Sequence, residues 1–196
     1  MIDLGLPSGT KWAFCNLGAK TYLDYGDYYA WGETDTKSSF SWKNYKYSGN
    51  TANSLTKYCT KSSYGRVDNK TTLEQVDDRV KTDYGYYFSI PTKEDWQELI
   101  DNCHWTHYDN HFMVKGPNGS IIILPSGGYM DGLNAYDTGV DGCYWSSSVD
   151  EQSPDDAWFV HINNAKPEFY SYYRYQGRCI RPVEHKPNFA APGAEQ

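Results

Sequence analysis

Residues 157–183, with the sequence AWFVHINNAKPEFYSYYRYQGRCIRPV, constrain the fold more than any other stretch of the chain. The first part alternates with a period of two, and Trp158, Val160 and Ile162 fall on one side of the alternation. Because successive side chains of a strand point to opposite faces of its sheet, the pattern predicts a strand with these three side chains in the core. A second strand is predicted after it, ending at Pro182, which cannot donate a hydrogen bond to a ladder.

The same alternation predicts that Phe159 faces outward, together with much of the tyrosine-rich run 170–175. Adjacent residues such as Tyr172 and Tyr173 face opposite ways, so large rings reach the surface unless both faces of the sheet are covered. A small soluble domain seldom exposes contiguous aromatic surface without a use for it. We therefore interpret this strand pair as the carrier of a binding surface. The alternative, that the tyrosines pack a Tyr-rich core, stays open.

The chain of 196 residues is long enough for one sizeable core, and no Pro/Ser-rich linker or charge block divides it. We expect one domain over residues 1–183 and a mobile tail over residues 184–196. A low mean hydropathy beside an aromatic content of 17% favours a loop-rich β protein with Trp and Tyr in its core. The predicted class is α+β, with mostly antiparallel strands, two short helices and long loops.

Net charge and hydropathy exclude two classes of partner. A net charge of −7 argues against nucleic acid, because binding to a phosphate backbone needs clustered Lys and Arg. No apolar run approaches the ~20 residues that span a bilayer, and the start of the sequence has no basic region followed by an apolar core. We expect no membrane insertion and no export signal in this chain.

Residues 91–103 carry the clearest helical signal. Thr92 is a natural N-cap, and the apolar positions recur at the spacing of one helix face. These positions are Trp96, Leu99, Ile100 and Cys103. The pattern predicts an amphipathic helix of about three turns.

Several other segments have local signals. Residues 112–115 and 121–124 flank Pro117-Asn118-Gly119, which predicts a hairpin, because Asn-Gly tolerates the positive φ of a tight turn. The run 121–124 is apolar without alternation, so we predict a central strand covered on both faces. Residues 2–13 are predicted to form a first strand with a turn at Pro7-Ser8-Gly9 and with Trp12 in the core. Residues 34–85 are predicted to be a long surface loop with a turn of helix within 72–80.

Three of the five histidines lie close together, at positions 104, 107 and 111, near a Cys and an Asp. Their spacing would allow a zinc or nickel site, but a position between a helix end and a hairpin suits solvated polar residues better. The five cysteines are widely spaced with no C-x-x-C pair, so we interpret most of them as small buried apolar residues, with one or two disulfides left open. We expect no metal and no cofactor.

Five motifs, in order along the chain, resemble the Fibrobacter succinogenes major paralogous domain. They are Leu4-Gly-Leu-Pro-Ser-Gly-Thr-Lys-Trp12-Ala, Tyr25-Gly-Asp-Tyr-Tyr-Ala-Trp31-Gly-Glu, Pro91-Thr-Lys-Glu-Asp-Trp96, Gly142-Cys-Tyr-Trp145-Ser-Ser-Ser and Gly177-Arg-Cys-Ile-Arg-Pro182. The resemblance covers residues 3–183. It implies a C-type-lectin-like fold of the kind found in surface proteins of gut anaerobes.

More distantly, the chain is similar to formylglycine-generating enzymes and to the variable proteins of diversity-generating retroelements, which include phage receptor-binding tips. The second similarity implies that residues on the last strands bind a ligand and are diversified by mutagenesis. Relatives often carry Asn at these positions, and aromatic replacements there resemble a selected paratope, because Tyr offers large contact area at low entropic cost. The residues are Phe159, His161, Asn163, Lys166, Glu168, Tyr170, Ser171, Tyr172 and Tyr173.

We therefore expect a non-enzymatic ligand-binding module, a hypervariable receptor-binding or adhesion protein. Its partner would be a protein or a glycan on another cell surface. The protein itself would be located on a bacterial cell surface or at a phage virion tip. At such a tip, a homo-oligomer would be expected. The alternative is a carbohydrate-binding or structural surface domain of fixed specificity with the same fold.

Two further interpretations are disfavoured. An enzyme of the formylglycine-generating kind would use Cys143 and Cys179, but no base or metal partner is visible beside Cys179. Calcium-dependent sugar binding is disfavoured because the lectin signatures are absent and residues 150–156 are better interpreted as a solvated acidic loop.

Overall fold

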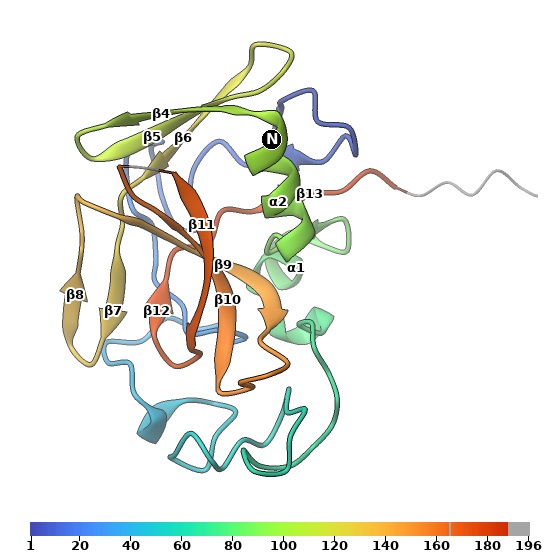
Figure 1. Ribbon diagram of the computed structural model, residues 1–196, viewed down its shortest axis with the longest axis vertical. Coiled ribbons are helices and arrows are strands. Elements are labelled where there is room, and N and C mark those ends of the chain that lie inside the picture. The colour runs from blue at the N-terminus through green and yellow to red at the C-terminus, as the bar shows by residue number, and fades with distance from the viewer. Residues whose placement is uncertain (165, 188–196) are drawn as a thin grey trace, which may run out of the picture.

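The computed structural model describes residues 1–164 and 166–187. The protein has an α+β fold of short antiparallel strands, two helices and long connections (Figure 1). The strands are β1 (Ile2–Asp3), β2 (Lys11–Trp12), β3 (Phe88–Ser89), β4 (His104–Tyr108), β5 (His111–Lys115), β6 (Ile121–Pro125), β7 (Tyr129–Asp131), β8 (Asn134–Tyr136), β9 (Gly142–Val149), β10 (Asp156–Ile162), β11 (Pro167–Tyr173), β12 (Gly177–Arg178) and β13 (Val183–Glu184). The helices are α1 (Arg79–Tyr84) and α2 (Lys93–Asn102), with 3-10 turns at Trp42–Asn44 and Gln75–Asp77.

The strands form four small sheets, with the orders β1-β2-β13-β3, β11-β10-β9, β12-β7-β8 and β4-β5-β6. In Figure 1 the β11-β10-β9 sheet stands in the middle, the β4-β5-β6 sheet lies above it, and α1 and α2 lie to its right. Of the helices in the described part of the chain, none is long and apolar enough to cross a bilayer.

Two hydrophobic cores lie on opposite faces of the central sheet. The helix-side core contains Val160 and Ile162, and the loop-side core contains Ala157 and Phe159, so strand β10 is covered on both faces. The helix-side core also contains Leu4, Trp12, Trp96, Leu99, Phe112, Val114 and Tyr144. The loop-side core also contains Trp31, Phe40, Tyr45, Tyr58, Val80 and Trp145.

Buried tryptophans tie the two cores together through their indole N–H groups. The Trp96 Nε1 donates to the Trp145 carbonyl at 3.2 Å, and the Trp31 Nε1 donates to the Ser146 carbonyl at 2.8 Å. The Trp145 Nε1 donates to the Tyr29 carbonyl at 2.7 Å. Because a buried indole needs a hydrogen-bond acceptor, these bonds fix each ring against strand β9 or its neighbour.

The predicted helix and hairpin are confirmed. Helix α2 has Thr92 as its N-cap, and the Thr92 hydroxyl accepts a bond from the Asp95 amide while the Asp95 carboxylate accepts one from the Thr92 amide. This capping box satisfies amide groups that the helix itself leaves unpaired. The predicted hairpin is formed by β5 and β6, and the predicted first strand by β1 and β2, with Trp12 buried.

Other expectations were wrong in detail. Strand β6 is an edge strand, not a central one, and Ile121 is 44% exposed while Ile122 is buried. The histidine-rich residues 104–108 form strand β4, which the sequence did not predict, because pairing with β5 decides their conformation. Strands β7 and β8 pair with each other, and the sequence patterns predicted no strand there. The residues after Tyr173 turn away into β12, which pairs with β7.

The carboxylate of Asp77 holds together the long segment 34–85. It accepts hydrogen bonds from the hydroxyls of Tyr47 and Tyr58 and from the ammonium of Lys57, at 2.6 Å for Tyr58 and 2.5 Å for Lys57. Burial acts to raise the pKa of Asp77, but the bonds from these three groups lower it to about 2. The segment predicted as a surface loop is therefore organised around a buried charge.

The predicted tail begins at Glu184, but Glu184 belongs to β13, which pairs with β2 and β3. The next residue, His185, places its Nε2 3.0 Å from a carboxylate oxygen of Asp95 on α2. The first tail residues are thus part of the folded domain. Residues 188–196 lie outside the described residues.

Candidate functional site

One face of the β10-β11 strand pair carries several of the residues that the sequence assigns to ligand binding. Strands β10 and β11 pair in a register that sets Phe159 opposite Tyr170 and His161 opposite Glu168. Cross-strand partners share a face of the sheet, as do residues two apart, so Tyr172 belongs to the same face. Tyr170 is 48% exposed and Tyr172 is 47% exposed. We call His161, Glu168, Tyr170 and Tyr172 the tyrosine face.

Polar contacts hold the side chains of the tyrosine face in place. The His161 Nε2 lies 2.9 Å from a carboxylate oxygen of Asp141, and the His161 ring meets the Tyr170 ring edge to face at 5.5 Å. The Tyr170 hydroxyl donates to the Glu168 carboxylate at 3.1 Å, and the Lys166 ammonium lies 3.1 Å from the same carboxylate. The bonds from Lys166 and then Tyr170 lower the pKa of Glu168. An exposed ring is thereby oriented by charged neighbours.

The expectation that Phe159 faces solvent was wrong. Phe159 lies on the same face as Tyr170, but it is only 7% exposed and belongs to the loop-side core. Its ring meets the Trp145 ring edge to face at 6.0 Å, and the Tyr170 ring covers it at 6.3 Å. The period-two pattern of the sequence correctly separated the two faces of β10. Both faces are covered at Phe159, however, so its side chain is buried. Phe159 therefore supports the tyrosine face from below.

A buried arginine lies under the same face. Arg178 is 2% exposed, and its guanidinium carbon lies 3.9 Å from the centre of the Phe159 ring and 4.4 Å from that of Trp145. Its Nη2 donates to the Gln176 side-chain oxygen at 2.7 Å, whereas Nε and Nη1 have no partner among the described residues. Burial lowers the pKa of Arg178 to about 10. The sequence patterns did not single out this residue, although its place in the motif Gly177-Arg-Cys-Ile-Arg-Pro182 marked the segment.

Ser171 is not part of the tyrosine face. It pairs with Trp158 across the strands, on the opposite face of the sheet, and its hydroxyl donates to the Asp150 carboxylate at 2.7 Å. Trp158, which was expected in the core, is only half-buried, and the Lys93 ammonium lies 3.6 Å from the centre of its ring. Trp158, which was predicted to be buried, is thus the more exposed of the two residues, and Phe159, which was predicted to be exposed, is buried.

Tyr173, the last residue of β11, extends the aromatic surface. Its ring contacts that of Tyr172 at 4.7 Å, stacks on that of Tyr175 at 5.6 Å and meets that of Trp42 at 5.8 Å. The Tyr175 hydroxyl donates to the Asp131 carboxylate at 3.1 Å. Trp42 and Asp131 come from distant parts of the chain, and sequence reasoning missed both. The length of the 34–85 segment was the one signal that pointed toward Trp42.

Asn163 and Lys166 flank the connection between β10 and β11. Asn163 is half-buried and follows the end of β10, while Lys166 is exposed and precedes β11. Of the nine predicted ligand-binding residues, the structure thus groups four on the tyrosine face, with Lys166 at one end and Tyr173 at the other. It places Phe159 beneath that face and Ser171 behind it.

The cysteines are all free in the described part of the chain. Cys143 and Cys179, which an enzyme of the formylglycine-generating kind would use, are both buried. Burial raises the pKa of the Cys143 thiol to about 12 and also raises that of Cys179. A nucleophilic thiol needs thiolate character and access, and these two sites provide neither.

The three clustered histidines make separate contacts. The His107 ring lies 4.9 Å from that of Phe112, and the His111 ring stacks on that of Tyr108 at 4.9 Å. His104 is exposed at the start of β4. Over residues 1–164 and 166–187, His, Cys, Asp and Glu side chains form no group of three or more that could hold a metal ion.

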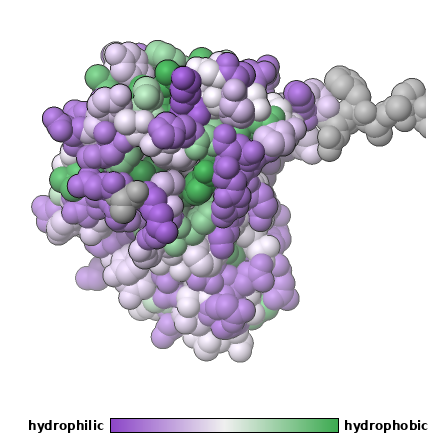
Figure 2. Space-filling model, turned by 45° about the horizontal axis from the view of Figure 1, so that its top comes forward, coloured by the Kyte–Doolittle hydropathy of each residue, from purple (hydrophilic) through white to green (hydrophobic). Residues whose placement is uncertain are grey.

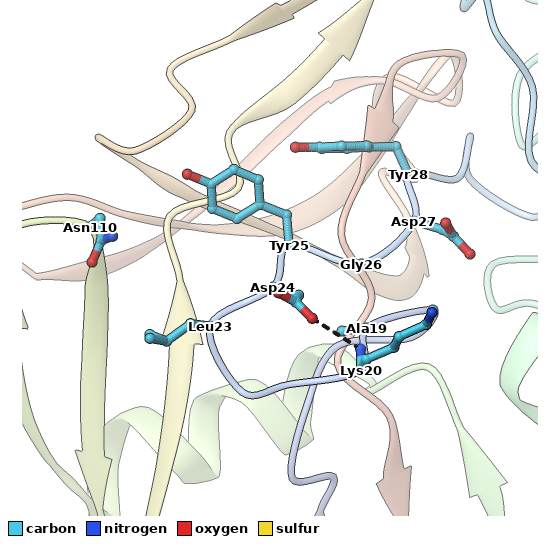
Figure 3. A pocket seen from close by; sticks show the side chains of 10 residues that line it. Ala19, Lys20, Leu23, Asp24, Tyr25, Gly26, Asp27, Tyr28 and Asn110 are labelled. Carbon is cyan, nitrogen blue, oxygen red and sulfur yellow. Dashed lines mark hydrogen bonds between the residues drawn. The ribbon is translucent and has the colours of Figure 1, made fainter.

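An open hollow of about 510 Å³ lies beside the loop 18–28, with Asn110 on its far side (Figure 3). Its polar groups are largely used by the fold. The Asp24 carboxylate accepts bonds from the backbone amides of Lys20 and Thr21, and the Tyr28 hydroxyl donates to the Gly127 carbonyl at 2.6 Å. These bonds shape the loop itself and use hydrogen-bonding capacity of Asp24 and Tyr28 that a ligand would otherwise meet.

Apolar residues form small, separate groups among hydrophilic ones on the face drawn in Figure 2. The exposed rings of the tyrosine face add surface of a different kind, because a tyrosine presents an apolar ring and a polar hydroxyl together. The candidate site is therefore amphipathic and not aliphatic.

The comparisons with known proteins give a family and no function. A family model described as a domain of unknown function, DUF8237, matches residues 32–183, which include the whole β11-β10-β9 sheet. Neither the curated proteins nor the solved structures contain a match to the chain. Residues 1–31 lie outside the matched region, although Leu4 and Trp12 complete the helix-side core. Because the match covers most of its length, the chain belongs to the DUF8237 family.

Proposed function

We propose that the protein is a non-enzymatic binding module that presents the tyrosine face to a protein on another cell surface. The observation that carries the proposal is the pair Tyr170 and Tyr172, which are about half-exposed, two residues apart on one strand, and supported by a buried layer of Phe159 and Arg178. Rings held in this way lose little conformational entropy on binding, which favours their use as anchors.

The charges around the two rings favour a protein partner over a flat glycan platform. The hydrogen-bonded pair of His161 and Asp141 and the ion pair of Lys166 and Glu168 lie at the edge of the aromatic surface. Protein interfaces commonly combine aromatic anchors with a polar rim of this kind. Each anchor that acts as a hot spot would contribute about 2 kcal/mol or more.

We further propose that the α+β domain is C-type-lectin-like and is related to the Fibrobacter succinogenes major paralogous domain and the variable proteins of diversity-generating retroelements. The motif tryptophans Trp12, Trp31, Trp96 and Trp145 are all fully buried, which supports a structural role for the motifs. The tyrosine face lies on the late strands where that relationship would place a diversified site. The location would be a bacterial cell surface or a virion tip, where a homo-oligomer would multiply weak contacts.

The experiment is binding of the purified, labelled protein to a panel of intact bacterial cells. We expect saturable binding to some cells and a loss of at least about 30-fold for Tyr170→Ala with Tyr172→Ala, because ~2 kcal/mol corresponds to about that factor. Tyr86→Ala is the matched control, since Tyr86 is 72% exposed after α1 and is not part of the tyrosine face. Equal binding of the double variant and the wild-type protein would rule the proposal out.

A further inference from the structure

A polar hollow of about 460 Å³ lies beside Trp158, on the face of β10 opposite the tyrosine face. It is lined by residues 71–72, by Lys93 and Glu94 at the start of α2, and by residues 148–152 at the end of β9. The volume falls within the range of roughly 300–1,000 Å³ that small-molecule sites occupy. The hollow shares no side chain with the tyrosine face, so binding there would be independent of the proposed function.

The walls of the hollow are fixed to one another. The Val149 amide donates to the Thr71 carbonyl at 2.9 Å, and the Ser146 hydroxyl donates to the Trp158 carbonyl at 2.8 Å. The segments that line the hollow are far apart in sequence but are joined by hydrogen bonds of this kind. A ligand would therefore meet a preformed site and would lose little affinity to ordering of the protein.

Charged groups around Trp158 have unused hydrogen-bonding capacity. The Lys93 ammonium lies 3.6 Å from the centre of the Trp158 ring and 5.3 Å from that of Phe169, but no described residue offers it a hydrogen-bond acceptor. The carboxylates of Glu94 and Glu151 receive no bond from any described residue. An ammonium donates three hydrogen bonds, and an ionised carboxylate only accepts them. The hollow thus presents donors and acceptors together beside a half-exposed aromatic ring.

We propose that this hollow binds a neutral saccharide, with one pyranose ring on Trp158. Each hydroxyl group of a sugar both donates and accepts, so a single ring can accept from Lys93 and donate to Glu94 or Glu151. The C–H face of the ring is apolar and suits the electron-rich face of an indole. The Lys93 stem is long and flexible, so its ammonium can move from the face of Trp158 to the ring edge and bond to a hydroxyl there.

Charged ligands fit the hollow less well. A polyanion would meet the carboxylates of Glu94, Asp150 and Glu151, which lie on the same rim. A cation would be repelled by the ammonium of Lys93, which lies 3.6 Å from the centre of the Trp158 ring. A neutral polyhydroxyl ligand is repelled neither by the carboxylates nor by this ammonium, and it needs only the movement of Lys93 to the ring edge described above.

The test is an array of immobilised glycans that includes neutral, acidic and amino sugars, followed by titration of the glycans that bind. We expect the full-length protein to bind neutral hexopyranose-containing glycans. Trp158→Ala should weaken binding at least ten-fold, and Glu94→Gln should weaken it several-fold without affecting the fold, since Glu94 is exposed. Trp42→Ala is the matched control, because it also removes a half-buried tryptophan but one that lies outside the hollow.

Tyr170→Ala with Tyr172→Ala should leave the glycan titration unchanged, which separates this site from the tyrosine face. Binding that is restricted to acidic or to amino sugars would overturn the assignment, as would the absence of any bound neutral glycan. Neutral-glycan binding that survives both Trp158→Ala and Glu94→Gln would place the sugar elsewhere and would equally overturn it.

Discussion

The guanidinium of Arg178 lies 3.9 Å from the ring of Phe159, and both side chains are buried directly beneath the exposed rings of the tyrosine face. A cation stacked on aromatic rings away from water is held by the ring quadrupole, and such contacts are stronger when desolvated. This relationship explains why a segment with the composition of a binding surface is also rigid. The outer rings rest on a layer whose own packing is fixed by the core.

Phe159 is therefore expected to act on stability and not on direct contact with a partner. Phe159→Ala should lower the free energy of unfolding by about 3–5 kcal/mol, because it leaves a cavity beside Trp145 and Arg178. Denaturant unfolding measures the change. Tyr172→Ala on the same face is the control, and it should change stability by less than about 1 kcal/mol. A Phe159→Ala protein as stable as wild type would contradict the packing described above.

Asp77 should control the order of residues 34–85. Asp77→Asn removes the charge to which Tyr47, Tyr58 and Lys57 donate, and should lower the free energy of unfolding by about 1–3 kcal/mol. Limited proteolysis should then cut the segment sooner than in wild type. Asp35→Asn, at an exposed position of the same segment, should have no such effect.

The Asp77 carboxylate should also make the stability of the folded protein depend on pH, with a loss of stability in acid. The pKa of Asp77 is about 2 in the folded protein and 3.8 in its ordinary state, so its contribution is complete above 3.8 and is lost as the pH falls toward 2. The difference in stability between wild type and Asp77→Asn should therefore shrink over that interval in acid titrations. A difference that stays constant down to pH 2 would show that the charge is not what holds the segment.

His185 should stabilise the end of the domain in a pH-dependent way. The hydrogen bond to Asp95 raises the pKa of His185 above 6.5, so its contribution is full below pH 6.5 and is lost as the pH rises through the raised value. His185→Gln should therefore destabilise the protein more at pH 5.5 than at pH 8.5. Because His185 is partly exposed, the effect should stay below about 1 kcal/mol. His104→Gln, at an exposed position on β4, is the control and should change the free energy of unfolding little.

Local signals predicted the elements whose conformation is decided locally. Thr92 and the apolar spacing after it specify helix α2, and Asn118-Gly119 specifies the turn between β5 and β6. By contrast, the polar run that forms β4 and the short strands β7 and β8 have weak signals of their own. Their conformation depends on a partner strand, which no local pattern contains.

The strand pair that carries the candidate site could be predicted from the sequence, but the exposure of its individual side chains could not. A period of two separates the residues of β10 into two faces, but it cannot say that both faces are covered, which is why Phe159 was misplaced. It also cannot bring Trp42 beside Tyr173, or Lys93 onto Trp158, because those contacts join segments far apart in the chain. Residues such as Tyr170 and Tyr172 were found because they repeat an unusual residue type on one strand.

The central claim is that the outward side chains of the tyrosine face form a diversified receptor surface. Sequencing of this locus across sibling isolates tests it most directly. We predict substitutions concentrated at the codons of His161, Glu168, Tyr170 and Tyr172, while the supporting residues Phe159 and Arg178 stay fixed. An invariant segment, or substitutions spread evenly over exposed and buried positions, would contradict the claim and would favour a surface domain of fixed specificity.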